Sequence, residues 1–170
     1  MTLVIDAVGA LTVETGTGSA DSDSYISVAD ATAYHALMGN TNWGLLTNTE
    51  KESALRRAAA YMEGAYRQSW RGTRLYRTQA LSWPRYGACV DGFDLPSNEV
   101  PSDIPLAQAD LALKAAAGDL APDIERAVIR EKVGPLETEY SPYGSQVTSY
   151  RAIALRLSPY LLAQNRLVRA

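Results

Sequence analysis

Apolar residues recur at helical spacing in four parts of the chain. Between residues 48 and 66, for example, Leu55, Met62 and Tyr66 share this spacing with several alanines. The pattern predicts a mainly α fold, a small helical bundle of about four helices. We expect these helices over residues 28–38, 48–66, 103–118 and 152–168.

Polar residues mark where these helices begin. Ser27 with Asp30, and Thr47 with Glu50, each fit a capping box, in which a side chain accepts a bond from the third backbone N–H of the helix. Within the last helix, Ser158-Pro159 predicts an interruption, because proline fits the first position of a restarting helix.

The rest of the chain predicts less regular structure. Residues 128–140 alternate partly around Gly134-Pro135, which predicts two short strands or one bent strand, a small β element beside the helices. Residues 1–24 end in a polar stretch rich in Gly and Ser, so we expect an N-terminal arm that is flexible or ordered by assembly. A single helical domain should then cover residues 25–170.

A long connection, Trp70–Pro105, joins the second and third predicted helices. Its length exceeds that of a simple turn, and its content of aromatic residues argues for an ordered segment. Four arginines precede its first carboxylate, Asp91. We therefore expect this long connection to pack onto the helices or onto a neighbouring molecule.

Charge is distributed in blocks along the chain, although the net charge is only −3. Residues 1–50 carry six acidic groups and no Lys or Arg, and residues 51–90 carry eight basic and two acidic groups. Residues 91–125 are again acidic and residues 126–170 basic. Such blocks suit a head-to-tail contact between copies that closes into a ring, or they neutralise each other within one subunit.

The sequence contains little that indicates catalysis. His35 and Cys89 are the only residues of their kinds, and neither has local partners for acid–base, nucleophilic or metal chemistry. Phosphate-binding loop motifs are absent, and no apolar run approaches the ~20 residues that span a bilayer. We expect a protein without enzymatic activity, without a cofactor or metal, and without a membrane partner.

Aromatic and arginine side chains together suit two kinds of surface. Single-stranded nucleic acid binds to stacking platforms in basic grooves, and the long connection has a loosely similar composition. The same residue types are enriched at protein–protein interfaces. The sequence pI of about 5.2 favours the protein interface or local packing.

Six segments, taken in order, resemble a family found in tailed bacteriophages and prophages. The matching segments are Tyr25–Tyr34 (YISVADATAY), Thr47–Ala58 (TNTEKESALRRA), Trp70–Arg74 (WRGTR), Gln79–Gly87 (QALSWPRYG), Ile104–Leu113 (IPLAQADLAL) and Arg130–Tyr140 (REKVGPLETEY). Proteins with these motifs are identified as head–tail connector (adaptor) proteins, and often carry the label DnaT-like single-stranded-DNA-binding protein.

The connector resemblance implies an assembly function. The protein would form a homo-oligomeric, twelvefold ring beneath the portal protein, bind tail or stopper proteins, and continue the channel through which DNA passes without specific binding. It would be made in the cytoplasm of the host bacterium and reside in the neck of the virion. The alternative implied by the second label is a single-stranded-DNA-binding protein.

The connector interpretation also implies two sets of contact residues. The candidate subunit interface consists of Trp70, Arg71, Arg74, Tyr76, Trp83, Arg85, Val133, Leu136 and Tyr140. The candidate portal-docking residues are Leu161, Leu162, Arg166 and Arg169.

Overall fold

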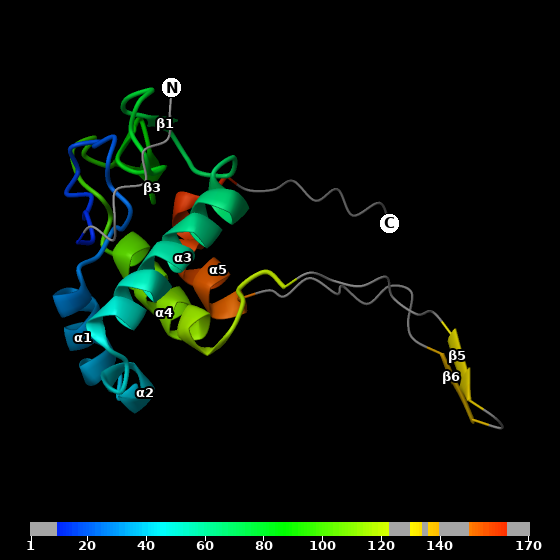
Figure 1. Cartoon of the computed structure of the whole chain (residues 1–170). Helices are drawn as coiled ribbons and strands as arrows, with labels where there is room; N and C mark the ends of the chain where they lie inside the picture. Colours follow the sequence, from blue (N-terminus) through cyan, green and yellow to red (C-terminus); the bar gives the residue numbers. More distant parts are fainter. Residues whose placement is uncertain (1–9, 123–129, 134–135, 140–149, 163–170) are drawn as a thin grey trace, which may run out of the picture.

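The computed structural model describes residues 10–122, 130–133, 136–139 and 150–162, with side chains for residues 10–122 and 150–162. Within these residues the fold is mainly α, as the sequence predicts (Figure 1). The helices are α1 (Val28–Leu37), α2 (Thr41–Gly44), α3 (Asn48–Tyr66), α4 (Asp103–Ala117) and α5 (Arg151–Leu157), followed by a 3-10 turn at Ser158–Tyr160. The strands are β1 (Thr73–Arg74), β2 (Arg85–Tyr86), β3 (Cys89–Val90), β4 (Phe93–Asp94), β5 (Arg130–Val133) and β6 (Leu136–Glu139).

The capping residues define the helix starts as predicted. Before α3, the Thr47 side chain accepts a bond from the Glu50 backbone N–H at 3.3 Å, and the Glu50 carboxylate accepts from the Thr47 N–H at 2.8 Å. Before α1, the Ser27 hydroxyl accepts from the Asp30 N–H at 3.0 Å. The short helix α2 was not predicted from the sequence, because its four residues are too few to produce a helical pattern.

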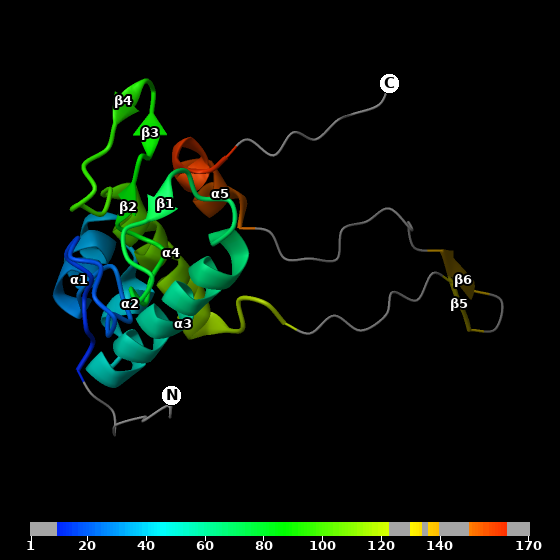
Figure 2. The same ribbon diagram turned by 90° about the horizontal axis from the view of Figure 1, so that it is seen from above.

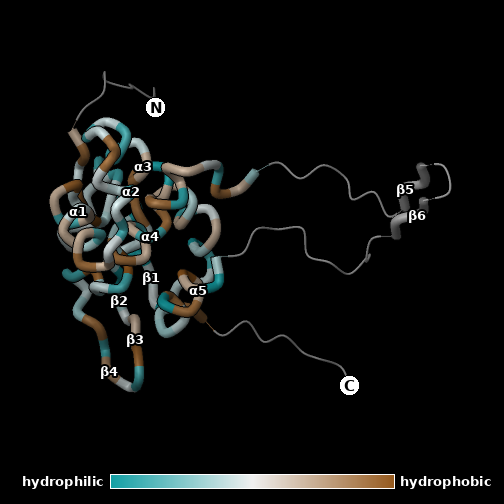
Figure 3. The backbone as a smooth tube through the Cα atoms, turned by 90° about the horizontal axis from the view of Figure 1, so that it is seen from below, coloured by the Kyte–Doolittle hydropathy of each residue, from teal (hydrophilic) through white to brown (hydrophobic). Residues whose placement is uncertain are grey.

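Helices α3 and α4 lie side by side at the centre and make the largest contact between elements (Figure 1). Small buried residues, among them Ala58 on α3 and Ala112 on α4, allow this close approach. Helix α5 packs on α4, while α1 and α2 lie at one end of the pair and β1–β4 at the other. Figure 3 shows hydrophobic residues gathered along the central helices, and also on the β3–β4 hairpin.

A buried glutamine fixes the entry of the chain into this core. Gln108 on α4 has no exposed surface. Its side-chain oxygen accepts a bond from the Tyr25 N–H at 2.7 Å, and its amide group donates to the Ser24 hydroxyl at 2.8 Å and to the Leu55 carbonyl at 2.9 Å. One side chain therefore joins α3, α4 and the segment before α1.

Residues 10–24 form a compact loop, within the segment that the sequence predicts to be an arm that is flexible or ordered by assembly. The loop closes around the buried carboxylate of Glu14, which accepts bonds from the backbone N–H groups of Gly16, Gly18 and Ser19 at 2.8–2.9 Å. Gly16 has a φ of 99°, and a Cβ there would lie 2.0 Å from the Asn98 carbonyl oxygen, so glycine is required. Residues 1–9 of the predicted arm lie outside the described residues.

Three antiparallel strand pairs complete the description. In the first two, β1 pairs with β2 and β3 with β4, all within the long connection, and Figure 2 shows the β3–β4 hairpin projecting from the body. In the third, β5 pairs with β6, with Val133 opposite Leu136. The prediction of two short strands around Gly134-Pro135 is thus confirmed. Among the helices that the structure describes, none is long and apolar enough to cross a membrane.

Candidate nucleic-acid interface

The long connection is anchored in the core by its tryptophans. Trp83 has no exposed surface and Trp70 is almost fully buried, and their rings meet edge to face with centroids 5.9 Å apart. Tyr160 closes the cluster, with its ring centroid 6.0 Å from that of Trp83. Within the single subunit these two tryptophans, which the connector interpretation places in the subunit interface, are therefore core residues.

Arg85 is buried as well, in a cage of backbone carbonyl groups. Its guanidinium donates to the carbonyl oxygens of Arg71 and Gly72 at 2.6 Å and to that of Ser82 at 3.1 Å. Burial lowers the pKa of this guanidinium from its ordinary value. Arg85, which the connector interpretation places in the subunit interface, thus holds the turns of the long connection together within the subunit.

The other predicted contact residues are more exposed. Arg71 and Arg74 are half-buried and Tyr76 is exposed. Of the candidate portal-docking residues, Leu161 is half-buried and its carbonyl accepts a bond from the Arg71 Nε at 3.1 Å, whereas Leu162 is exposed. The side chains of Val133, Leu136, Tyr140, Arg166 and Arg169 lie outside the described residues.

The exposed end of the long connection mixes aromatic and acidic groups. Tyr76, Tyr86 and Phe93 all expose more than half of their surface. Asp91 and Asp94 are exposed on the same β3–β4 hairpin as Phe93. Carboxylates at this density repel a phosphate backbone, so this end suits a protein contact better than nucleic acid.

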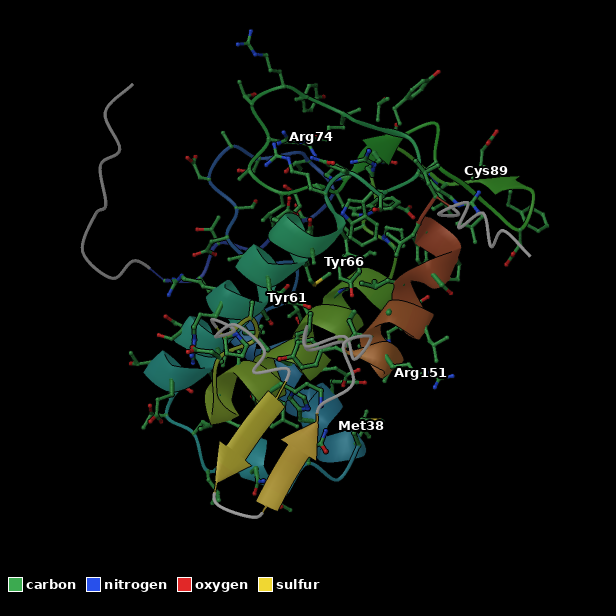
Figure 4. All side chains as sticks on the ribbon, turned by 90° about the vertical axis from the view of Figure 1, so that its right-hand side faces the viewer. Met38, Tyr61, Tyr66, Arg74, Cys89 and Arg151 are labelled. Carbon is green, nitrogen blue, oxygen red and sulfur yellow. The ribbon has the colours of Figure 1, made fainter. Side chains whose placement is uncertain are left out.

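A second surface combines tyrosines with cations along α3, α4 and α5. We call it the tyrosine–cation face, and it consists of Arg57, Tyr61, Lys114, Tyr150 and Arg151. The rings of Tyr61 and Tyr150 meet edge to face with centroids 5.4 Å apart. The Lys114 ammonium lies 5.9 Å from the centre of the Tyr150 ring. Figure 4 looks onto this side of the molecule and labels Tyr61 on α3 and Arg151 on α5.

The tyrosines of this face are partly buried and keep part of their surface exposed. Tyr61 and Tyr150 are half-buried, and the Tyr150 hydroxyl donates to the Leu120 carbonyl at 3.0 Å. Burial raises the pKa of Tyr61, which therefore remains neutral at physiological pH. The three cations, by contrast, are exposed. The face thus presents neutral aromatic rings between positive charges.

Two cavities flank the tyrosine–cation face. One, of about 260 Å³, lies between α3 and the end of α4 and is lined by Arg57, Ala60, Tyr61, Ala115, Gly118, Asp119, Leu120 and Ala121. The other, of about 350 Å³, is lined by Asn42, Leu46, Leu113, Lys114, Ala116 and Ala117. Asp119 is the one carboxylate among these lining residues. The balance of charge on this surface is therefore positive.

Comparison with protein families places the chain as a whole. The family model described as “Putative DnaT-like ssDNA binding protein” matches residues 9–170, nearly the whole chain. The chain belongs to this family. Neither the search of curated proteins nor the search of solved structures found a match.

The DnaT-like family model agrees with one of the two labels that the resemblance carries. It agrees with the single-stranded-DNA-binding label, and it gives no support to the head–tail connector label. The tyrosine–cation face combines aromatic rings with positive charge. These are the two features that surfaces for single-stranded nucleic acid share.

Sequence reasoning missed the tyrosine–cation face. Arg57 and Tyr61 are four residues apart on one helix, so their proximity could have been inferred. Tyr150 comes from a distant part of the chain, and no sequence pattern indicates that its ring reaches Tyr61. In the long connection, by contrast, aromatic residues and arginines lie close together in sequence, so the sequence pattern indicates that segment instead.

His35 and Cys89, the two residues considered for catalysis, lie in surroundings that suggest a structural role. His35 is buried, with its Nε2 3.1 Å from the Ala109 carbonyl oxygen and its Nδ1 3.1 Å from the Asn40 amide nitrogen. Burial lowers the pKa of His35, so the ring is neutral, donating from Nε2 and accepting at Nδ1. Cys89 is a half-buried free thiol on β3. Within the described residues, no cluster of His, Cys, Asp and Glu side chains could hold a metal ion.

Proposed function

We propose that this protein binds single-stranded DNA on its tyrosine–cation face and catalyses no reaction. The observation that carries the proposal is the Tyr61–Tyr150 ring pair, with the Lys114 ammonium over the Tyr150 ring and Arg57 beside Tyr61 in the wall of one cavity. The membership of the chain in the DnaT-like family supports the same function.

The chemistry of a single strand explains why this combination matters. Unpaired bases stack on aromatic rings, and each such contact contributes about 1–3 kcal/mol whichever base is present. Exposed cations meanwhile neutralise phosphates and release condensed counterions. The net charge of −3 does not oppose this, because the surface where binding occurs is locally positive.

The proposal predicts salt-dependent binding that requires the cations of this face. Fluorescence anisotropy with a labelled oligo(dT) should give binding that weakens as salt rises. The double substitution Lys114→Ala with Arg151→Ala should weaken binding and reduce the slope of log K against log salt by about 0.7 for each phosphate that the variant no longer neutralises. Both residues are exposed, so the fold should tolerate the change.

Arg77→Ala provides the matched control for this experiment. Arg77 is an exposed cation on the long connection, away from the tyrosine–cation face. The control variant should bind like the wild type. Equal losses in Arg77→Ala and in the double variant would mean that DNA binds elsewhere or only through general charge, and would contradict the proposed site.

A second candidate function is assembly as a ring-forming connector that binds portal and tail proteins. One observation favours it: apolar side chains are exposed at both ends of the molecule. Leu37 and Leu45, near α1 and α2, are 88% and 82% exposed, and Phe93 on the opposite β3–β4 hairpin is 76% exposed (Figure 1). Exposed apolar side chains at opposite ends of one subunit suit a head-to-tail contact between copies.

Light scattering after size-exclusion chromatography tests the assembly candidate. We expect the wild type to form oligomers as its concentration rises, and Phe93→Ser to shift the equilibrium towards the monomer. Thr73→Ser, which also introduces a serine at an exposed position but removes only a methyl group, should leave the distribution unchanged. A wild-type protein that stays monomeric at high concentration, alone and with portal protein, would contradict this candidate.

A further inference from the structure

The cavity between α3 and the end of α4 carries two charged groups that the fold does not use. Arg57 and Asp119 both line it. Both side chains are exposed, and neither makes a hydrogen bond or ion pair with a residue of the described segments. Elsewhere on α3, the neighbouring Arg56 is bound to Asp23 and Glu52. Arg57 and Asp119 are therefore available to a ligand.

The remainder of the cavity wall is apolar and aromatic. Ala60, Ala115 and Leu120 contribute aliphatic surface, and Tyr61 contributes part of its ring. The volume of about 260 Å³ lies below the ~300–1,000 Å³ typical of sites for drug-sized ligands. A flat heteroaromatic ring the size of one nucleobase suits such a site, because it can lie against the apolar wall and direct its polar edges outward.

The charges at the rim discriminate among the bases. Guanine presents two acceptors, O6 and N7, on one edge, and arginine recognises this pair with two N–H donors. On its other polar edge guanine presents two neighbouring donors, N1–H and the N2 amino group. An ionised carboxylate offers two neighbouring acceptors that match them. None of adenine, cytosine and thymine presents both the pair of acceptors and the pair of neighbouring donors.

We propose that this cavity holds one unstacked guanine base of a single strand, with Arg57 towards O6 and N7 and Asp119 towards N1 and N2. This inference rests on the proposed function, since the tyrosine–cation face must first hold the strand. It also explains a carboxylate on a surface that otherwise favours phosphate: Asp119 weakens general attraction and adds selectivity for one base.

Anisotropy titrations with a matched set of oligonucleotides test the inference on the full-length protein. Each is an oligo(dT) with one central position occupied by guanine, adenine, cytosine, thymine or hypoxanthine; a single guanine prevents quadruplex formation. We expect the guanine oligonucleotide to bind about five- to tenfold more tightly than the thymine one, the lower part of the range for a two-point contact at an exposed site. Hypoxanthine lacks the N2 amino group and should lose most of that preference.

Asp119→Asn identifies the residue responsible. The substitution keeps the size of the side chain and removes one of the two acceptors for N1–H and the N2 amino group, so the preference for guanine should fall to the part that Arg57 alone provides. Binding of plain oligo(dT) should stay equal or strengthen, because a negative charge is removed. Asp94→Asn, the same change on the β3–β4 hairpin, should keep the preference.

The outcomes separate this inference from the proposed function. Tight binding of all five oligonucleotides with equal affinity would overturn the guanine site and leave single-strand binding intact. A guanine preference that is undiminished in Asp119→Asn would overturn the role of Asp119 and thus the site as proposed. Failure to bind any of the five would overturn both proposals.

Discussion

Trp83→Ala is expected to destabilise the folded subunit by about 3–5 kcal/mol, the usual cost of removing a large buried aromatic side chain. Trp83 has no exposed surface, and its ring contacts those of Trp70 and Tyr160. Since small domains unfold at a cost of only about 5–15 kcal/mol, this loss is a large share of the total. Urea denaturation followed by circular dichroism measures it.

Two further variants make the Trp83 prediction specific. Phe93→Ala removes an aromatic side chain that is 76% exposed and should change the free energy of unfolding little. Trp83→Phe keeps a ring and removes an indole N–H that has no partner within the described residues, so it should cost less than Trp83→Ala. Equal midpoints for Trp83→Ala and Phe93→Ala would show that Trp83 is not a core residue.

Gln108→Leu is expected to destabilise the protein by about 1–3 kcal/mol, although leucine has a similar size and is more apolar. The substitution leaves the Tyr25 N–H buried without the oxygen that it now donates to at 2.7 Å. A buried donor without its partner incurs most of its desolvation cost. The Leu55 carbonyl loses a bond as well, but it remains within α3, where helical bonding continues.

Thermal or urea unfolding of Gln68→Leu serves as the control for Gln108→Leu. Gln68 is exposed just after α3, so the same chemical change there should have an effect close to zero. If Gln108→Leu proved as stable as the wild type, the network that joins α3, α4 and Tyr25 would contribute little, and the account of the core would be wrong on this point.

The helices could be predicted from the sequence because their signals are local. Thr47 and Glu50 lie next to the helix that they start, and the structure contains both bonds of their capping box. Residues 128–140 likewise contain their own alternation and turn, so the β5–β6 pair was foreseen. Helix α5 ends at Leu157, where the sequence predicts an interruption, but the predicted restart of the helix is not seen: a 3-10 turn at Ser158–Tyr160 is followed by extended backbone at Leu161.

The assignment of surface and core within the long connection could not be predicted in the same way. Tryptophan and arginine are enriched at protein interfaces, but they also fill cores when partners are available. The carbonyl groups that surround Arg85 come from turns whose shape no sequence pattern specifies. Glu14 is a similar case, since backbone N–H groups supply most of its partners.

The tyrosine–cation face depends on a contact between residues that are far apart in sequence. Tyr61 and Tyr150 come from distant parts of the chain, and their contact brings Lys114, which lies over the Tyr150 ring, onto the same surface as Arg57. Reasoning from single segments therefore assigned the candidate site to the long connection, where aromatic residues and arginines are neighbours in sequence. Tertiary packing instead buries the tryptophans there and creates the mixed surface elsewhere.

The most direct test of the central claim is photo-cross-linking to an oligonucleotide that contains 5-iododeoxyuridine, with the modified peptides identified by mass spectrometry. The account predicts cross-links in the peptides that contain Tyr61 or Tyr150, and their loss when excess unlabelled single strand competes. Cross-links confined to Tyr76, Tyr86 or Phe93, or none under conditions in which a control single-strand-binding protein reacts, would contradict it.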